Sequence, residues 1–129
     1  MRILFFLCSF ALVLTGCTEK HAPEAAPAPQ AAPAPEVEDG IQVVKIAVGN
    51  LGYKPSRIAL QAGIPARLVF TRTSSSGCTE EVHIPDFYIA RTFLPMNEPV
   101  AIEFTPTEPG TYTFACGMKM LKGTLVVKT

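Results

Sequence analysis

Short segments rich in β-branched and aromatic residues follow one another from residue 41 to residue 129, with glycine, proline or polar turns between them. β-branched and aromatic side chains favour strands, whereas glycine and proline interrupt regular structure. Short strands at spacings of roughly 8–12 residues are typical of a β-sandwich or a β-barrel. No stretch has a persuasive helical period. We therefore predict an all-β domain at 41–129, with strands near 41–48, 57–60, 66–72, 82–84, 89–94, 100–104, 111–116 and 124–128.

Residues 1–16 have the pattern of an export signal. A basic residue precedes the apolar run at 3–14, which is too short to span a bilayer. The sequence LTGC at 14–17 resembles the bacterial lipobox, which implies that Cys17 is lipidated and becomes the mature N-terminus. An ordinary cleaved signal peptide, with Cys17 incidental, is the alternative. The pattern predicts an envelope lipoprotein that faces the periplasm, and Thr18 after the cysteine favours the outer membrane.

Residues 17–40 are predicted to form a tether between the lipidated cysteine and the domain. Alanine and proline alternate along much of this segment, and it contains no aromatic residue. Such a composition buries too little apolar surface to fold, and proline stiffens the chain towards extended polyproline II structure. The segment therefore predicts a disordered linker that holds the domain away from a membrane.

The charge and the available catalytic side chains exclude several classes of function. The chain has 11 basic and 11 acidic residues, and it has no arginine cluster or basic stripe. We therefore expect no nucleic-acid partner. The sequence also lacks a serine–histidine–aspartate set, a paired acid and base, and a histidine cluster. We expect a monomeric protein that is not an enzyme.

A compact group of sulfur side chains begins at the end of the predicted strand 111–116. The alternation of this strand puts Cys116 on its apolar face. Gly117 lets the chain turn, and Met118 and Met120 follow at a spacing of two. One thiolate and two thioethers form a soft donor set that suits Cu(I) better than Mg²⁺, Ca²⁺ or Mn²⁺. The alternative is core packing, which is common for methionine and free cysteine.

Three stretches of the predicted domain form a further pattern: YKPSRIALQAGIPARLVF at 53–70, IPDF at 84–87 and PGTYTFACG at 109–117. These stretches resemble the cupredoxins, the superfamily of plastocyanin and azurin. The ending CGMKMLKG at 116–123 is similar to that of bacterial copper-handling domains, including those fused to copper-transporting P-type ATPases. The resemblance covers essentially all of 41–129. It implies a Greek-key β-sandwich with copper bound at one end.

The pattern departs from that of a blue-copper electron carrier. A type 1 copper site has two histidines, a cysteine and a weak axial methionine, whereas His83 is the only histidine of the predicted domain. By position, the resemblance makes Cys116 a copper ligand. The family's first histidine ligand falls in the sequence GCTEE, which contains no histidine, and Cys78 is its natural substitute. Glu80 and Glu81 are less favoured oxygen donors there.

His83 and Cys78 each have a second interpretation. In an extended chain counted from Cys78, His83 points to the opposite face, which indicates a surface histidine, although it remains an additional candidate ligand. Cys78 and Cys116 could instead form a disulfide, because exported proteins with two cysteines often do. Metal-bound thiolates are the preferred interpretation, and the two states could alternate as one redox switch.

The combined prediction is a lipid-anchored cupredoxin-like protein that binds copper, favoured as Cu(I), through Cys78, Cys116, Met118 and Met120. We expect it to sequester copper in the bacterial envelope or to transfer it to an export or assembly partner. One alternative is a one-electron carrier. The other is a metal-free interaction domain held together by a disulfide between Cys78 and Cys116.

Overall fold

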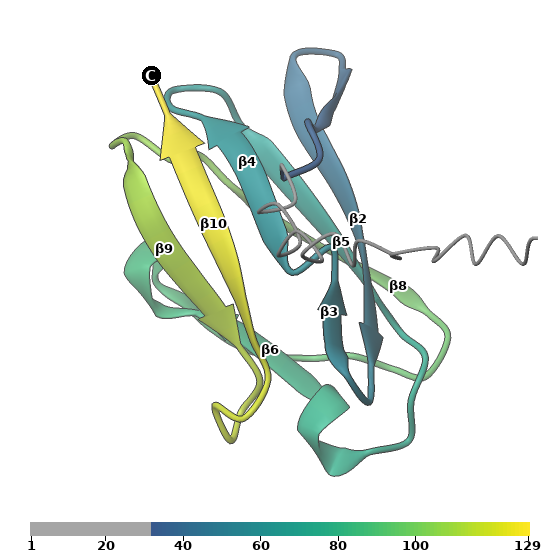
Figure 1. Cartoon of the computed structure of the whole chain (residues 1–129). Coiled ribbons are helices and arrows are strands. Elements are labelled where there is room, and N and C mark those ends of the chain that lie inside the picture. Colours follow the sequence, from purple (N-terminus) through teal and green to yellow (C-terminus); the bar gives the residue numbers. More distant parts are fainter. Residues whose placement is uncertain (1–31) are drawn as a thin grey trace, which may run out of the picture.

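The computed structural model describes residues 32–129, which form two β-sheets packed against each other (Figure 1). Two short 3₁₀ helices, η1 (Gly77–Thr79) and η2 (Pro85–Phe87), lie between strands. The predicted all-β sandwich is confirmed, and every predicted strand has a counterpart. The strands are β1 (Glu36–Glu38), β2 (Ile41–Gly49), β3 (Gly52–Lys54), β4 (Arg57–Gln61), β5 (Ala66–Arg72), β6 (Glu81–Ile84), β7 (Ile89–Phe93), β8 (Pro99–Phe104), β9 (Gly110–Ala115) and β10 (Lys122–Lys128).

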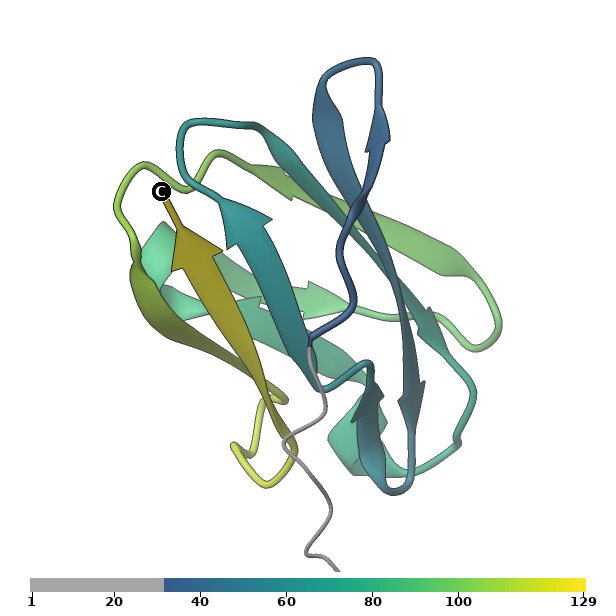
Figure 2. The ribbon, with the colours of Figure 1, turned by 45° about the horizontal axis from the view of Figure 1, so that its top comes forward.

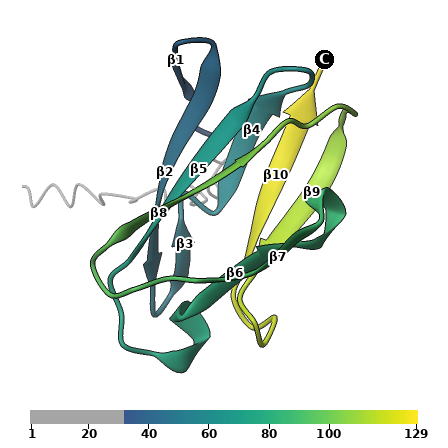
Figure 3. The same ribbon diagram turned by 180° about the vertical axis from the view of Figure 1, so that it is seen from behind.

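The order of the strands brings distant parts of the chain together at the ends of the sandwich. One sheet has the order β1-β2-β5-β8, with β3 also paired to β2, and the other has the order β4-β10-β9-β6-β7. The chain changes sheets after β3, β4, β5, β7 and β8. The views in Figures 2 and 3 show that the segment before β6 and the loop after β9 reach the same end of the molecule.

Alternate side chains of the strands meet between the sheets and form the core. Every second side chain of β5 is buried, and Phe70 is completely enclosed. Phe114 of β9 packs edge-on against Phe70 and Tyr53, with ring centroids 5.8 and 4.8 Å apart. Edge-to-face contacts are a favoured geometry for aromatic pairs. Because Phe114 lies two residues before Cys116, this aromatic cluster fixes the end of β9 from which the sulfur-bearing loop starts.

A close contact that requires glycine joins β9 to β10. Gly123 lies opposite Phe114 in the register of the two strands. A Cβ atom at residue 123 would overlap the Phe114 ring. The ring occupies the space that a side chain would need, so glycine lets β10 pair closely with the strand that leads to the sulfur loop.

The first strand lies inside the segment 17–40, for which the sequence predicts a tether. β1 pairs antiparallel with β2 through a turn at Asp39 and Gly40, and both turn residues have positive φ. All three side chains of β1 are exposed, so the strand adds backbone hydrogen bonds but little core. The predicted signal at 1–16 and Cys17 lie outside the described residues. Within residues 32–129, no helix is long and apolar enough to cross a membrane.

Candidate metal centre

Backbone hydrogen bonds close the loop at residues 116–121, which connects β9 to β10. The N–H of Cys116 donates to the carbonyl of Leu121 at 3.0 Å, and the N–H of Lys119 donates to the carbonyl of Cys116 at 2.9 Å. The N–H of Leu121 also donates to the Cys116 sulfur at 3.3 Å. Cys116 is completely buried. Its sulfur is therefore held at the base of this loop, which is the yellow-green hairpin below β9 in Figure 1.

Cys78 reaches Cys116 from a separate part of the chain. It lies in η1, the green coil at the same end of the sandwich as the 116–121 loop (Figures 1 and 3). The two cysteine side chains are close enough that each shifts the pKa of the other. Both are free thiols. The structure thus brings together the two residues that the sequence proposes as thiolate ligands.

Hydrogen bonds to its sulfur favour the thiolate form of Cys116. Burial by itself raises the pKa of this thiol, but hydrogen bonds from the backbone of Leu121, Met120 and Met118 and from the Cys78 side chain lower it. The net effect is a lowered pKa for Cys116. The pKa of Cys78 is raised by desolvation, by its hydrogen bond to Cys116 and by the charge of that residue. In the metal-free pair, Cys116 therefore ionises before Cys78.

The sequence predicts an extended chain from Cys78 to Ile84, and this prediction is wrong for its first residues. Residues 77–79 form a 3₁₀ turn because the N–H groups of Thr79 and Glu80 bond back to Ser76 and Gly77. Alternation begins only in β6, where Val82 and Ile84 are buried. His83 is partly exposed and pairs with Ala115 of β9, and alternation puts Ala115 on the face of β9 opposite Cys116.

Arg72 holds η1 in place and is not among the residues predicted from the sequence. The residue is 7% exposed. Its Nε atom donates to the Ser74 carbonyl at 2.8 Å and to Oγ1 of Thr79 at 3.1 Å. Its two Nη atoms donate to the Leu94 carbonyl at 3.4 Å and to Oε1 of Glu80 at 3.3 Å. The alternation of β5 carries a signal that could have found it, because a charged residue falls at an inward-facing position.

The two candidate oxygen donors have other partners. Glu80 belongs to the η1 network just described, with half of its side chain exposed. Oε2 of Glu81 lies 3.8 Å from Nη1 of Arg91, and the carboxylate packs against Gly117. Across residues 32–129, no three His, Cys, Asp or Glu side chains are grouped so that they could share a metal ion. The assignment of Glu80, Glu81 and His83 as additional ligands stays a prediction.

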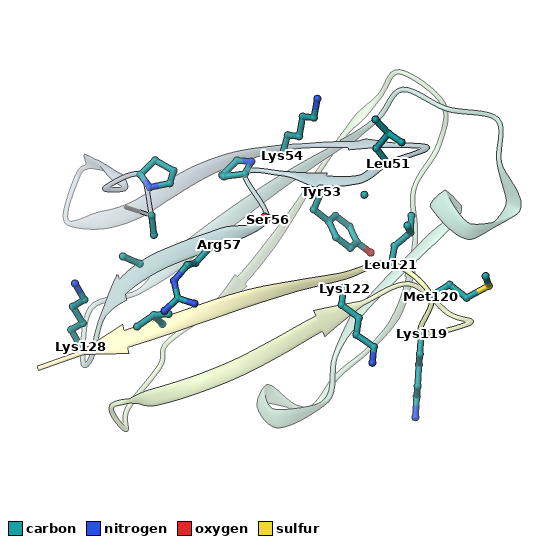
Figure 4. A pocket seen from close by; sticks show the side chains of 16 residues that line it. Leu51, Tyr53, Lys54, Ser56, Arg57, Lys119, Met120, Leu121, Lys122 and Lys128 are labelled. Carbon is teal, nitrogen blue, oxygen red and sulfur yellow. The ribbon is translucent and has the colours of Figure 1, made fainter. Parts of the chain in front are cut away.

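The methionines of the 116–121 loop lie on the surface. Met118 is 61% exposed and Met120 is 74% exposed, which excludes core packing as their role. Met120 also borders a groove lined by residues of β3, β4 and β10 (Figure 4). The charged residues that line this groove are all basic: Lys54, Arg57, Lys119, Lys122 and Lys128.

A family model described as the cupredoxin-like domain matches residues 6–127 of the chain. The chain belongs to the cupredoxin-like family. The resemblance noted in the sequence is therefore confirmed, and it accounts for the two-sheet fold. No curated protein matches the chain.

Two solved cupredoxin-like structures have substantial identity to the chain. One is the metal-binding domain of the Cu(I)-exporting P-type ATPase CopA of Streptococcus pneumoniae with Cu(I), at 39% identity and a TM-score of 0.70. That match covers 74% of this chain and 93% of the other. The second is a copper-binding protein in its apo form, at 36% identity, covering 76% and 98% of the two chains with a TM-score of 0.70. Auracyanin B is 18% identical over 76% of this chain and 96% of its own, with a TM-score of 0.55, and shares the fold alone.

Proposed function

We propose that this cupredoxin-like protein binds copper as Cu(I) at the end of the sandwich and passes it on as cargo. The observation that carries the proposal is the pairing of the Cys78 and Cys116 side chains beside two exposed methionines. Thiolate and thioether sulfur are soft donors that select Cu(I). The lowered pKa of Cys116 also fits, because a thiol must lose its proton to bind a metal.

The exposure of the methionines favours transfer over permanent storage. Met118 and Met120 lie at the surface directly after a buried cysteine, so a partner protein has access to the outer donors of the site while Cys116 stays enclosed. The metal-binding domain of the Cu(I)-exporting ATPase is 39% identical to this chain, and this similarity supports the same assignment. We propose a copper exporter or a copper-protein assembly factor as the partner. Lys119 and Lys122 flank the site and would favour an acidic docking surface.

A Cu(I) competition titration of the reduced full-length protein, with a chromophoric chelator, tests this proposal. We expect tight Cu(I) binding. The same protein with Cu(II) should not give the intense visible thiolate band of a blue-copper site, because the domain lacks a second histidine. A strong and stable blue signal would instead favour the electron carrier. Failure to compete for Cu(I), together with a Cys78→Ser variant that melts at a much lower temperature under oxidising conditions, would favour the disulfide-held domain.

We further propose that the protein is a lipoprotein of the bacterial envelope, anchored through Cys17. The support is the coincidence of a short apolar run, small residues and a cysteine at 14–17. Cys17→Ala should leave the chain unacylated and release it from membranes. Fractionation of cells that express the parent or the variant measures this. Equal membrane association of the two forms would contradict the proposed anchor.

A further inference from the structure

The groove that Met120 borders carries charge of a single sign. It lies between β3 on one side and β4 and β10 on the other, and it begins at the 116–121 loop (Figure 4). Like charges that share one groove repel one another, so an anion that enters it is attracted by all of them. The described residues that line it include five basic side chains and no acidic one: Lys54, Arg57, Lys119, Lys122 and Lys128.

The five groove cations also lack acidic neighbours, unlike the arginines elsewhere in the domain. Each arginine outside the groove lies near a glutamate: Arg67 near Glu103 at 2.7 Å, Arg72 near Glu80 at 3.3 Å and Arg91 near Glu81 at 3.8 Å. Within residues 32–129, none of the groove cations makes such a pair. Their charge is therefore not offset inside the domain and is available to an anionic partner.

The strand register makes this groove long and narrow. Lys122 and Lys128 line it from the same side of β10, and Arg57 lies beside them on the neighbouring strand β4. From residue 122 to residue 128 a strand rises by about 20 Å, which is also the length of an extended segment of about six residues. Lys54 of β3 lies on the opposite side, so such a segment would have cations along both of its edges (Figure 4).

One end of the groove is part of the candidate metal centre. Lys119, Met120 and Leu121 belong to the 116–121 loop and line the groove as well. Met120 is 74% exposed, so a molecule in the groove has direct access to its sulfur. Whatever binds along β10 is therefore brought next to an outer donor of the proposed copper site.

We propose that the groove docks an extended acidic segment of the protein that exchanges copper with this chain. Carboxylates along the segment pair with the groove cations and bring the copper ligands of the partner next to Met120. An anionic bilayer is the other large anion that a lipid-anchored protein meets, but a flat surface reaches only the rim of a groove whose cations come from both sides. The inference rests on the proposed Cu(I) function.

Binding of a fluorescent hexaglutamate peptide to the reduced full-length protein tests the groove. Fluorescence anisotropy should show binding at low ionic strength and release as salt is added, because salt screens exposed charges. Hexaglutamine, which is neutral, should not bind. In a spectrum of ¹³C-labelled methionine methyl groups, hexaglutamate should shift the signal of Met120 and leave that of Met96 in place, because Met96 does not line the groove.

Charge reversal separates the groove from the overall charge of the protein. Arg57→Glu and Lys128→Glu should each weaken hexaglutamate binding by about fivefold, because each replaces an attraction between exposed charges with a repulsion. Lys45→Glu is the matched control, because Lys45 is an exposed lysine of β2 outside the groove. It makes the same change in net charge and should bind hexaglutamate as the parent does. All three variants should keep the Cu(I) affinity of the parent, because none of them alters η1 or the 116–121 loop.

An equal loss of hexaglutamate binding in Lys45→Glu would overturn the inference, because net charge alone would then explain the binding. Binding of the parent to vesicles of phosphatidylglycerol and phosphatidylcholine, without binding to hexaglutamate, would also overturn it and assign the groove to a membrane. A parent that binds Cu(I) but not hexaglutamate would overturn the inference and leave the proposed function intact. A parent that binds hexaglutamate but not Cu(I) would remove the proposed function, and with it the role of the groove in copper exchange.

Discussion

Replacing Cys116 by serine is expected to weaken Cu(I) binding more than any other single substitution in the chain. Loss of a residue that only supports a metal ligand typically costs about 10–100-fold in affinity, so loss of this ligand should cost about 100-fold or more. Cys116 offers copper a soft sulfur whose pKa is already lowered. Serine offers a hard oxygen instead, and that oxygen keeps its proton near neutral pH. The fold should survive, because the N–H of Leu121 that now bonds to the sulfur is able to bond to the serine oxygen.

The titration that measures this effect includes Met118→Leu and Met120→Leu as comparison variants. Thioethers are neutral donors, so each methionine substitution should cost less affinity than Cys116→Ser. Both side chains are exposed and leucine has a similar volume, so the melting temperature of the metal-free protein should stay the same. An unchanged affinity of Cys116→Ser would refute its role as a ligand. Unchanged affinities of both methionine variants would restrict the site to the two cysteines.

Gly123→Ala is expected to have the largest effect on stability among conservative substitutions, a loss of about 3 kcal/mol in the free energy of unfolding. The added methyl group would overlap the Phe114 ring, and Phe114 is enclosed by the core and has no room to withdraw. Denaturant unfolding of the reduced, metal-free protein measures the change. Gly77→Ala is the matched control, because a Cβ there meets no atom within 4 Å, and its stability should be close to that of the parent.

A double substitution tests whether the Phe114 ring is the cause. Phe114→Leu removes the ring atoms that the new methyl group would meet, although it is destabilising by itself through lost core packing. The double variant should therefore be more stable than the sum of the two single effects predicts, by about 1–2 kcal/mol. Strict additivity would show that Gly123 and Phe114 do not interact, and the close contact between β9 and β10 would be wrong.

The sandwich and half of the candidate site follow from local patterns in the sequence. Alternation predicts that Phe114 and Cys116 face inward, and both are buried. Strand alternation is dictated by backbone geometry, so it survives in the folded protein wherever one face is covered. The exposure of Met118 and Met120 was also predictable, because lysines and glycines surround them in a short connection between strands.

The other half of the site depends on contacts between segments far apart in the chain. η1 is held in place by Arg72, which bonds to Thr79 and Glu80 and, from the end of β5, to the distant Leu94 carbonyl, and no local pattern around Cys78 specifies this. The basic groove is likewise visible only once β3 lies beside β10, because Lys54 and Lys128 are far apart in the chain. β1 was missed for a simpler reason. Its side chains are all exposed, so it carries no hydrophobic pattern.

X-ray absorption at the copper K-edge of the reduced protein, loaded with one equivalent of Cu(I), tests the central claim most directly. The account predicts a copper site with sulfur donors only, contributed by Cys78, Cys116 and the methionines of the 116–121 loop. A Cys78→Ser, Cys116→Ser double variant treated in the same way should retain no copper after desalting. Nitrogen or oxygen donors in the parent, or an unchanged spectrum in the double variant, would contradict the assignment of copper to this sulfur site.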